Sequence, residues 1–438
     1  MSVDVFDSLE SEVRSYCRSW PVVFERARGS SVLAEDGTEY LDFFSGAGAL
    51  NYGHNHPDLL RPLVEYLRDG AVVHSLDMKT TAKRRFLEVF RDLVLAPRDL
   101  DYKVMFPGPT GTNSVEAALK LARKVTGRQH VLSFTNAFHG MTLGALAVTG
   151  NSMKRKGAGI PLTNSSKIPY DDYFSGATED FLWLERVLED SGSGVDKPAA
   201  IIVETVQGEG GLNAARAEWL QALAELCRRH GILLIVDDVQ AGCGRTGTFF
   251  SFEEAGIVPD IVCLSKSISG FGLPMALTLV RPELDVWSPG EHNGTFRGHN
   301  LAFVTGTAAL ERFWADDAFP RQVVERITQL QAGLEDIAGK HEGTCVRGRG
   351  MLTGIWFPDA TAAEKVAAEA FERGLLVETS GPESEVVKVM PPLTIEPDEL
   401  ARGLDILSAA TDSVLDAVPE GDPAASSRTA NPRRQEIA

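Results

Sequence analysis

Two buried-strand patterns in the middle of the chain each end in a side chain that could take part in catalysis. The apolar run Ile232–Asp237 ends in an acid, which Asp238 follows, and the run Ile261–Leu264 is followed closely by Lys266. Ligands of an open parallel sheet bind at the carboxyl ends of its strands. The acids at 237 and 238 and Lys266 are therefore expected at the edge of the sheet where a ligand binds.

Each of these side chains also has an ordinary structural explanation. Asp237 and Asp238 could cap the turn after their strand, and Lys266 could be a surface lysine that follows a strand. The pair is more informative, because an acid and a lysine at two consecutive strand ends suit a cofactor that needs both. Pyridoxal 5′-phosphate (PLP) is such a cofactor, since a lysine amine takes its aldehyde and an acid partners its pyridine nitrogen.

Two further segments could hold other parts of such a cofactor. The loop that opens the segment 106–124 is rich in glycine and proline and leads into an amphipathic helix, with Gly111 and Thr112 at its start. Free N–H groups at a helix start attract a phosphate, although most such patterns are ordinary capped helices. In the segment 134–142, Phe138 could lie flat against a ring, or it could be a core residue beside a turn glycine.

The elements that must position these residues form an alternating pattern. Strand patterns at 130–134, 199–204, 232–237 and 261–264 alternate with helical patterns such as 114–124 and 216–230. Unbroken apolar strands between helices predict an α/β fold with a mostly parallel sheet. From about residue 316 the pattern changes to helices near 319–340, 361–374 and 397–415 around the extended stretches 346–357 and 386–390. The predicted division is an N-terminal segment 1–57 that joins a small α+β domain at 316–418, a large cofactor domain at 58–315 and a disordered tail at 419–438.

Composition excludes several classes of function. The 438 residues carry a net charge of −18, which argues against a nucleic-acid surface. The five cysteines form no CxxC pair, and we expect reduced thiols and no metal site. The sequence shows no signal peptide and no apolar run long enough for a membrane helix, so we expect a cytoplasmic protein with no membrane partner.

Taken in order, these motifs resemble the class III (ω-amino acid) aminotransferases of PLP fold type I. The likeness runs from about Val22 to Leu415 and includes YLDFFSGAGALNYGHNHP, ETVQGEGG, GTFRGHN and the segments around Asp237 and Lys266. It implies PLP as cofactor, a seven-stranded, mostly parallel sheet, and a homodimer or larger homo-oligomer with active sites at the subunit interface. It leaves a dependence on potassium open, as it does the oligomer size.

The resemblance also implies residue roles. Lys266 would carry the cofactor and move the proton, and Asp237 would keep the pyridine nitrogen protonated. The other implied cofactor contacts are Val239 and Phe138 on the two ring faces, Gln240 at the ring hydroxyl, Gly111 and Thr112 at the phosphate, Thr295 at the phosphate of the neighbouring subunit, and Glu204 at the pocket wall.

The sequence departs from the family pattern where substrate carboxylates are held. Relatives that use ornithine-type donors usually have arginine where this chain has Met141, and many have arginine where it has Lys388. Lysine keeps the charge but loses the bidentate fork. We expect Glu209 and Lys388 to form a switchable ion pair, so that removing Glu209 would leave an uncompensated positive charge. The alternative is that Lys388 is a solvated strand residue.

The segments GAGALNYGHN, SFTNAFHGMTLGALAVTGN and KVMPPLTI resemble one branch of the family, which makes diaminobutyrate for ectoine synthesis. This implies a ping-pong transfer between L-glutamate and L-aspartate 4-semialdehyde, giving 2-oxoglutarate and L-2,4-diaminobutyrate. The pathway could instead lead to a siderophore or peptide. Other functions that stay open are an aminotransferase for 4-aminobutyrate or ornithine, a PLP aminomutase or decarboxylase, and a PLP-fold regulator without catalysis.

Overall fold

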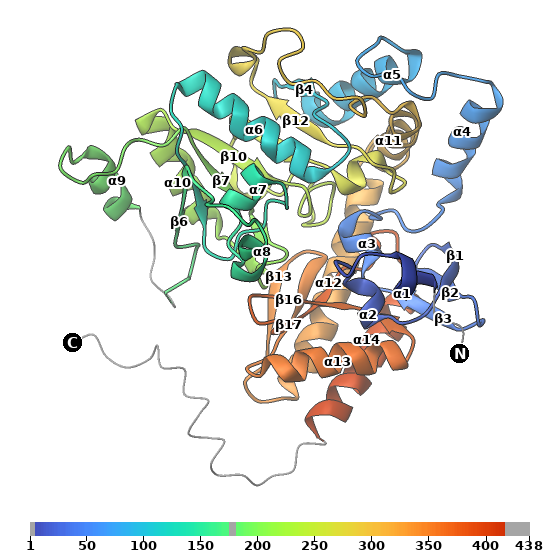
Figure 1. Cartoon of the computed structure of the whole chain (residues 1–438). Helices are drawn as coiled ribbons and strands as arrows, with labels where there is room; N and C mark the ends of the chain where they lie inside the picture. Colours follow the sequence, from blue (N-terminus) through green and yellow to red (C-terminus); the bar gives the residue numbers. More distant parts are fainter. Residues whose placement is uncertain (1–4, 175–180, 417–438) are drawn as a thin grey trace, which may run out of the picture.

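The largest sheet has seven strands, in the order β4-β12-β11-β10-β7-β5-β6 (Figure 1). The computed structural model describes residues 5–174 and 181–416, and the tail predicted at 419–438 lies outside the described residues. The seven strands are β4 (Lys103–Met105), β5 (Val131–Phe134), β6 (Ser165–Ile168), β7 (Ala200–Val203), β10 (Leu233–Asp237), β11 (Ile261–Leu264) and β12 (Leu277–Val280).

One strand of this sheet runs against the others. β12 pairs antiparallel with both β11 and β4, whereas the pairs β11–β10, β10–β7, β7–β5 and β5–β6 are parallel. The predicted α/β fold with a mostly parallel seven-stranded sheet is confirmed. Because Asp237 is in register with Cys263, the strand ends before Asp238 and Lys266 lie side by side.

Helices cover both faces of the sheet, as alternate side chains of the buried strands require. α6 (Gly111–Thr126) packs its apolar face with Ala200, Ile202 and Ile235 in one cluster. α10 (Ala217–His230) packs in a second cluster with the neighbouring positions Ile201 and Val236, which point the other way. The remaining helices up to residue 313 are α1 (Val5–Leu9), α2 (Tyr16–Ser19), α3 (Ser45–Gly48), α4 (Pro57–Arg68), α5 (Thr81–Phe90), α7 (Leu143–Val148), α8 (Ser152–Lys156), α9 (Leu182–Glu189) and α11 (Asn300–Phe313).

The C-terminal part forms an antiparallel sheet in the order β13-β14-β17-β16. Its strands are β13 (Cys345–Arg349), β14 (Leu352–Trp356), β16 (Glu378–Ser380) and β17 (Val386–Val389), with the helices α12 (Ala318–Gly339), α13 (Ala360–Glu372) and α14 (Pro397–Leu415) beside them. The extended stretch 346–357 is thus two strands. They turn at Gly350, where φ is +67° and an added Cβ would lie 2.7 Å from the carbonyl oxygen of Arg245.

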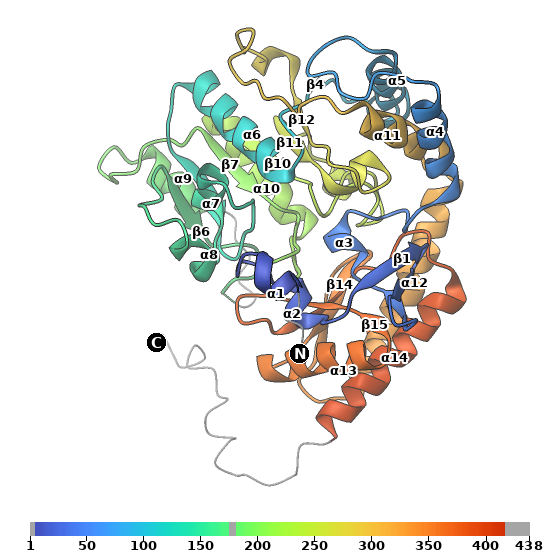
Figure 2. The same cartoon turned by 45° about the vertical axis from the view of Figure 1, so that its right-hand side comes forward.

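The N-terminal strands pair with a segment from the far end of the chain. β1 (Phe24–Arg28), β2 (Ser31–Ala34) and β3 (Glu39–Asp42) form a sheet that β15 (Leu375–Leu376) completes beside β3. In both views α2 lies beside the C-terminal sheet (Figures 1 and 2). β8 (Val206–Gln207) and β9 (Asn213–Ala214) form a small hairpin after β7. Within residues 5–174 and 181–416, no helix has the length and apolar character to cross a membrane.

Candidate active site

A cavity of about 370 Å³ opens at the carboxyl ends of β10 and β11. Its walls come from the loops after these strands, the start of α6 and the segment before α7. The structure brings most of the predicted site residues to this cavity, namely Gly111, Thr112, Phe138, Glu204, Glu209, Asp237, Val239, Gln240 and Lys266.

Lys266 is a half-buried side chain at the start of a short 3-10 turn after β11. Its φ of +53° turns the chain sharply, and its Nζ donates a hydrogen bond to the carbonyl oxygen of Ala47 at 2.7 Å. The neighbouring Ser267 donates to the carbonyl of Gly48 at 2.8 Å, which holds the N-terminal segment over the lysine. Burial lowers the pKa of Lys266, which favours the neutral amine that attacks an aldehyde. The alternative of a surface lysine is therefore wrong.

The adjacent acids Asp237 and Asp238 point to different surroundings. Asp237 lines the cavity, where its Oδ2 lies 2.8 Å from Nδ1 of His139. Asp238 lies outside the cavity lining, and its Oδ2 accepts a hydrogen bond from the backbone of Ser251 at 3.1 Å. Burial raises the pKa of Asp238 to about 7. Only the first acid is placed to meet a ligand, and its partner His139 is a residue that the sequence analysis did not single out.

The start of α6 forms one end of the cavity. Gly111 is the first residue of this helix, and a Cβ there would lie 2.8 Å from Cγ1 of Val239. The hydroxyl of Thr112 lies 2.7 Å from that of Thr142, which in turn donates to Glu116. The first N–H groups of a helix are free to bind an anion. This end of the cavity therefore has the features of a phosphate site.

Two side chains with unusual surroundings form the middle of the cavity. Phe138 is half-buried at the cavity wall and not a core residue, and its backbone N–H donates to Glu204 at 2.8 Å. Burial raises the pKa of Glu204, and the nearby Asp237 adds to this effect. The amide of Gln240 donates to the carbonyl of Ala47 at 3.0 Å and to Glu209 at 3.2 Å. Its Oε1 is buried against Gly208, where an added Cβ would lie 1.6 Å away, and it has no hydrogen-bond partner among the described residues.

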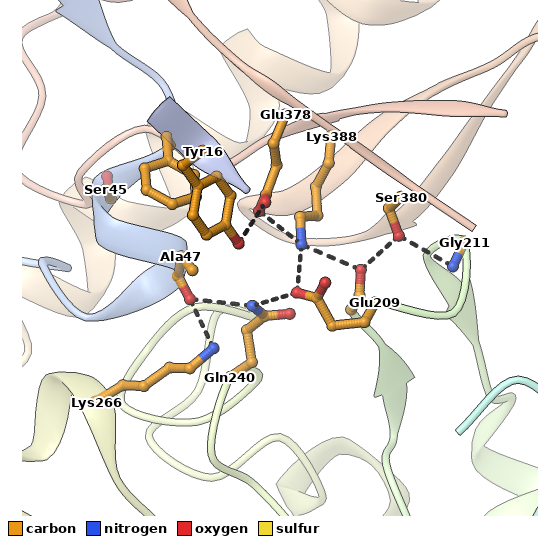
Figure 3. Close-up of polar contacts among 12 residues, drawn as sticks. Tyr16, Ser45, Ala47, Glu209, Gly211, Gln240, Lys266, Glu378, Ser380 and Lys388 are labelled. Carbon is orange, nitrogen blue, oxygen red and sulfur yellow. Dashed lines mark hydrogen bonds and ion pairs between the residues drawn. The ribbon is translucent and has the colours of Figure 1, made fainter. Parts of the chain in front are cut away.

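The far end of the cavity is bounded by Glu209, which forms the ion pair expected from the sequence with Lys388, a residue outside the lining (Figure 3). Nζ of Lys388 lies 2.8 Å from Oε1 of Glu209. It also lies 2.8 Å from Oε1 of Glu378, and the hydroxyl of Tyr16 donates to the second oxygen of Glu378 at 3.2 Å. The Lys388 side chain is fully buried, so the alternative of a solvated strand residue is wrong.

Burial disfavours the charged forms of Glu209, Glu378 and Lys388. The attraction between opposite charges outweighs this effect at Glu209 and Lys388, whereas burial raises the pKa of Glu378. Burial would raise the pKa of Glu209, yet Lys388 and then Lys266 lower it to about 2. Burial would also lower the pKa of Lys388, but Glu209 and Glu378 raise it. Because Glu378 is a second partner, loss of Glu209 would leave Lys388 paired. The expected uncompensated charge was therefore wrong, and Glu378 was missed.

Three predicted residues are not part of the cavity lining, namely Lys388, Met141 and Thr295. Met141 is 53% exposed, and Thr295 is exposed in the loop before α11. The role of Thr295 in a neighbouring subunit stays a prediction, and so does a role of Met141 at the substrate.

Comparison with known proteins identifies the class. The aminotransferase class-III family matches residues 14–411. A diaminobutyrate–2-oxoglutarate transaminase of Streptomyces anulatus is 64% identical over 93% of this chain and 97% of its own length. One of Halalkalibacterium halodurans is 59% identical over 94% of this chain and 97% of its own length. This chain therefore belongs to the class III aminotransferases.

A solved structure agrees with this assignment. A structure of the ornithine aminotransferase from Toxoplasma gondii, described as having partial occupancy of PLP at its active site, superposes with a TM-score of 0.80 at 26% identity and covers 94% of both chains. Membership of the family implies that this enzyme is an aminotransferase that uses PLP and acts on small amino and keto acids.

Proposed function

We propose that this protein is a diaminobutyrate–2-oxoglutarate transaminase. It would take an amino group from L-glutamate and give it to the 4-carbon of L-aspartate 4-semialdehyde, forming L-2,4-diaminobutyrate. The observation that carries the proposal is its high identity, over nearly the whole chain, to transaminases of this name. The carboxylate of Glu209 at the cavity wall adds support, because it could meet the second ammonium group of a diamine.

The cavity residues suit PLP along its whole length. We propose that Gly111 and Thr112 hold the phosphate, that Val239 and Phe138 face the two sides of the ring, and that Gln240 reaches the ring hydroxyl. The support is the close approach of Gly111 to Val239, the free helix start and the place of Gln240 in the cavity lining. The backbone bond from Phe138 fixes Glu204 at the pocket wall.

Two side chains carry the chemistry in this proposal. Bound PLP supplies an electrophilic carbon and a ring that withdraws electrons from the substrate. The amine of Lys266, neutral at lower pH than an exposed lysine, binds the cofactor and then accepts and returns the substrate proton. Asp237, held by His139, stabilises a positive charge on the ring nitrogen.

The far end must accept two unlike substrates. Glutamate brings a carboxylate that needs a positive charge, whereas diaminobutyrate brings an ammonium that is repelled by one. We propose that Glu209 covers Lys388 while the diamine is bound and turns away for glutamate. The 2.8 Å ion pair and the position of Glu209 at the cavity wall support this switch.

An amino-donor screen tests the function. With 2-oxoglutarate as acceptor, diaminobutyrate should give a higher kcat/KM than ornithine, lysine or 4-aminobutyrate. If ornithine or 4-aminobutyrate is the better donor, the specific assignment is wrong and the enzyme is another ω-amine aminotransferase. Turnover that needs no keto acid would point instead to an aminomutase or a decarboxylase.

The remaining expectations belong to the same proposal. We propose a homodimer or larger homo-oligomer, supported by the exposure of Thr295 away from the cavity, and a cytoplasmic enzyme of ectoine synthesis. Light scattering tests the first, and an ectoine assay after gene deletion tests the second. Comparing rates in sodium and potassium salts tests whether potassium is needed.

A further inference from the structure

Glu378 has no role in the switch described above, yet it is the second carboxylate that pairs with the ammonium group of Lys388. It lies directly opposite Lys388 in the antiparallel pair of β16 and β17. Directly opposed residues of opposite charge on neighbouring strands stabilise one another. The ion pair of Glu378 and Lys388 is therefore built into the ladder of the C-terminal sheet (Figure 3).

Glu209 is placed differently, although its backbone is held as firmly. The hydroxyl of Ser380 donates to the carbonyl of Gly208 and accepts from the backbone of Gly211. The backbone N–H of Gly381 donates to the carbonyl of Glu209 at 3.3 Å. These bonds fix the loop and leave the Glu209 side chain as its movable part. That side chain lines the cavity, whereas Glu378 and Lys388 do not.

Two carboxylates, those of Glu209 and Glu378, therefore pair with the single ammonium group of Lys388. If Glu209 were the sole partner of Lys388, the ammonium would cancel its charge and leave none for a ligand. With Glu378 in place, the two carboxylates share the charge of Lys388, so Glu209 keeps negative charge for a ligand while it stays on Lys388. The hydroxyl of Tyr16, from the N-terminal helix α2, holds the other oxygen of Glu378 in position.

We propose that Glu378 is a specificity-determining residue, which shares the charge of Lys388 and so leaves Glu209, in its place on Lys388, with negative charge for the α-ammonium group of a diamine substrate. This inference rests on the proposed function. Glu378 acts through Lys388 and does not touch the substrate, so it is a positioning residue. It makes the enzyme favour donors that carry a second ammonium beyond the amine transferred.

The test compares two donors that differ at one group. Diaminobutyrate and 4-aminobutyrate have the same chain and the same reacting amine, but only the first carries an α-ammonium. The half-reaction of each donor with the holoenzyme is followed by the cofactor absorbance in stopped flow. For Glu378→Gln, kcat/KM should fall about tenfold or more with diaminobutyrate and change little with 4-aminobutyrate. Glu378→Asp should recover part of the loss, and the exposed Glu383→Gln of the same hairpin controls for loss of one charge.

A double variant guards against a merely structural effect. In Glu378→Gln with Lys388→Met, no ammonium remains to hold Glu209, so the preference for diaminobutyrate should return to that of the wild type. Equal losses with both donors in Glu378→Gln, an unchanged ratio, or a double variant no more selective than the single one would each overturn the inference. A wild type without preference for diaminobutyrate would instead contradict the proposed function.

Discussion

His139 and Asp237 form a buried pair in which the imidazole Nδ1 lies 2.8 Å from the carboxylate Oδ2. The histidine side chain is fully buried, and its Nε2 has no partner among the described residues. A second bond to Asp237 comes from the backbone of Val239 at 3.2 Å. The aspartate is thus fixed with its charge directed at the cavity, which is the arrangement that a cationic ring nitrogen needs.

Replacing Asp237 should remove most of the activity. Asp237→Asn should lower kcat by about 10²-fold or more, because a fixed charge at a shielded site stabilises the developing charge of the transition state. Asp238→Asn is the matched control, since Asp238 bonds Ser251 away from the cavity. Steady-state kinetics with saturating cofactor measure both. A larger loss in the Asp238 variant would move the role to the second acid.

Asp238 should instead affect the dependence of stability on pH. Its folded pKa of about 7 lies above the ordinary aspartate value of 3.8, so the folded state binds the proton more tightly. Its contribution to stability is fully present below pH 4 and is lost as the pH rises through 7, by roughly 2–4 kcal/mol. Asp238→Asn should therefore gain stability relative to the wild type between pH 5 and pH 8. Urea unfolding at both pH values checks this, and a constant difference would show that Asp238 is already ionised at pH 5.

The close approach of α6 to the ring wall predicts a loss of cofactor affinity in Gly111→Ala. The new methyl would lie 2.8 Å from Val239 and would push it into the cavity. We expect PLP to bind about tenfold more weakly, measured by titration of the apoenzyme. Gly339→Ala is the control, because nothing lies within 4 Å of a Cβ at that position. Equal affinities in the two variants would show that Val239 can move aside.

Lys388 should matter more for one substrate than for the other. In Lys388→Met the positive charge proposed for the glutamate carboxylate is gone, so the half-reaction with glutamate should slow far more than that with diaminobutyrate. The methionine fills a similar volume, which limits the cost of the buried position. Stopped-flow measurements of the two half-reactions decide. Equal slowing would rule the switch out and leave the carboxylate anchor to be found elsewhere.

Much of the fold and the centre of the site could be predicted from the sequence. The apolar runs before Asp237 and Lys266 are strands because both of their faces are buried. Their parallel pairing then places the two strand ends side by side. Such features depend on local pattern and on the general geometry of parallel sheets. The helix start at Gly111 and Thr112 and the aromatic Phe138 were also candidates from the sequence pattern, and the resemblance in ordered motifs added Val239 and Gln240.

The contacts that were missed depend on tertiary pairing. Glu378 meets Lys388 because two strands of a hairpin align in a particular register, which the sequence does not show. Tyr16 reaches Glu378 from the opposite end of the chain. His139 was not singled out, since nothing local indicates that its ring points at Asp237. A short sequence separation between opposite charges around a glycine turn was the only available signal for Glu378.

The most direct test of the account is to identify the lysine that holds the cofactor. The purified enzyme should be yellow, and borohydride should fix the pyridoxyl group to one lysine, which peptide mapping by mass spectrometry identifies. We expect the label on Lys266, which follows β11 and lines the cavity. We also expect Lys266→Ala to bind PLP without turning over. A label on any other lysine, such as the buried Lys388, would contradict the central claim.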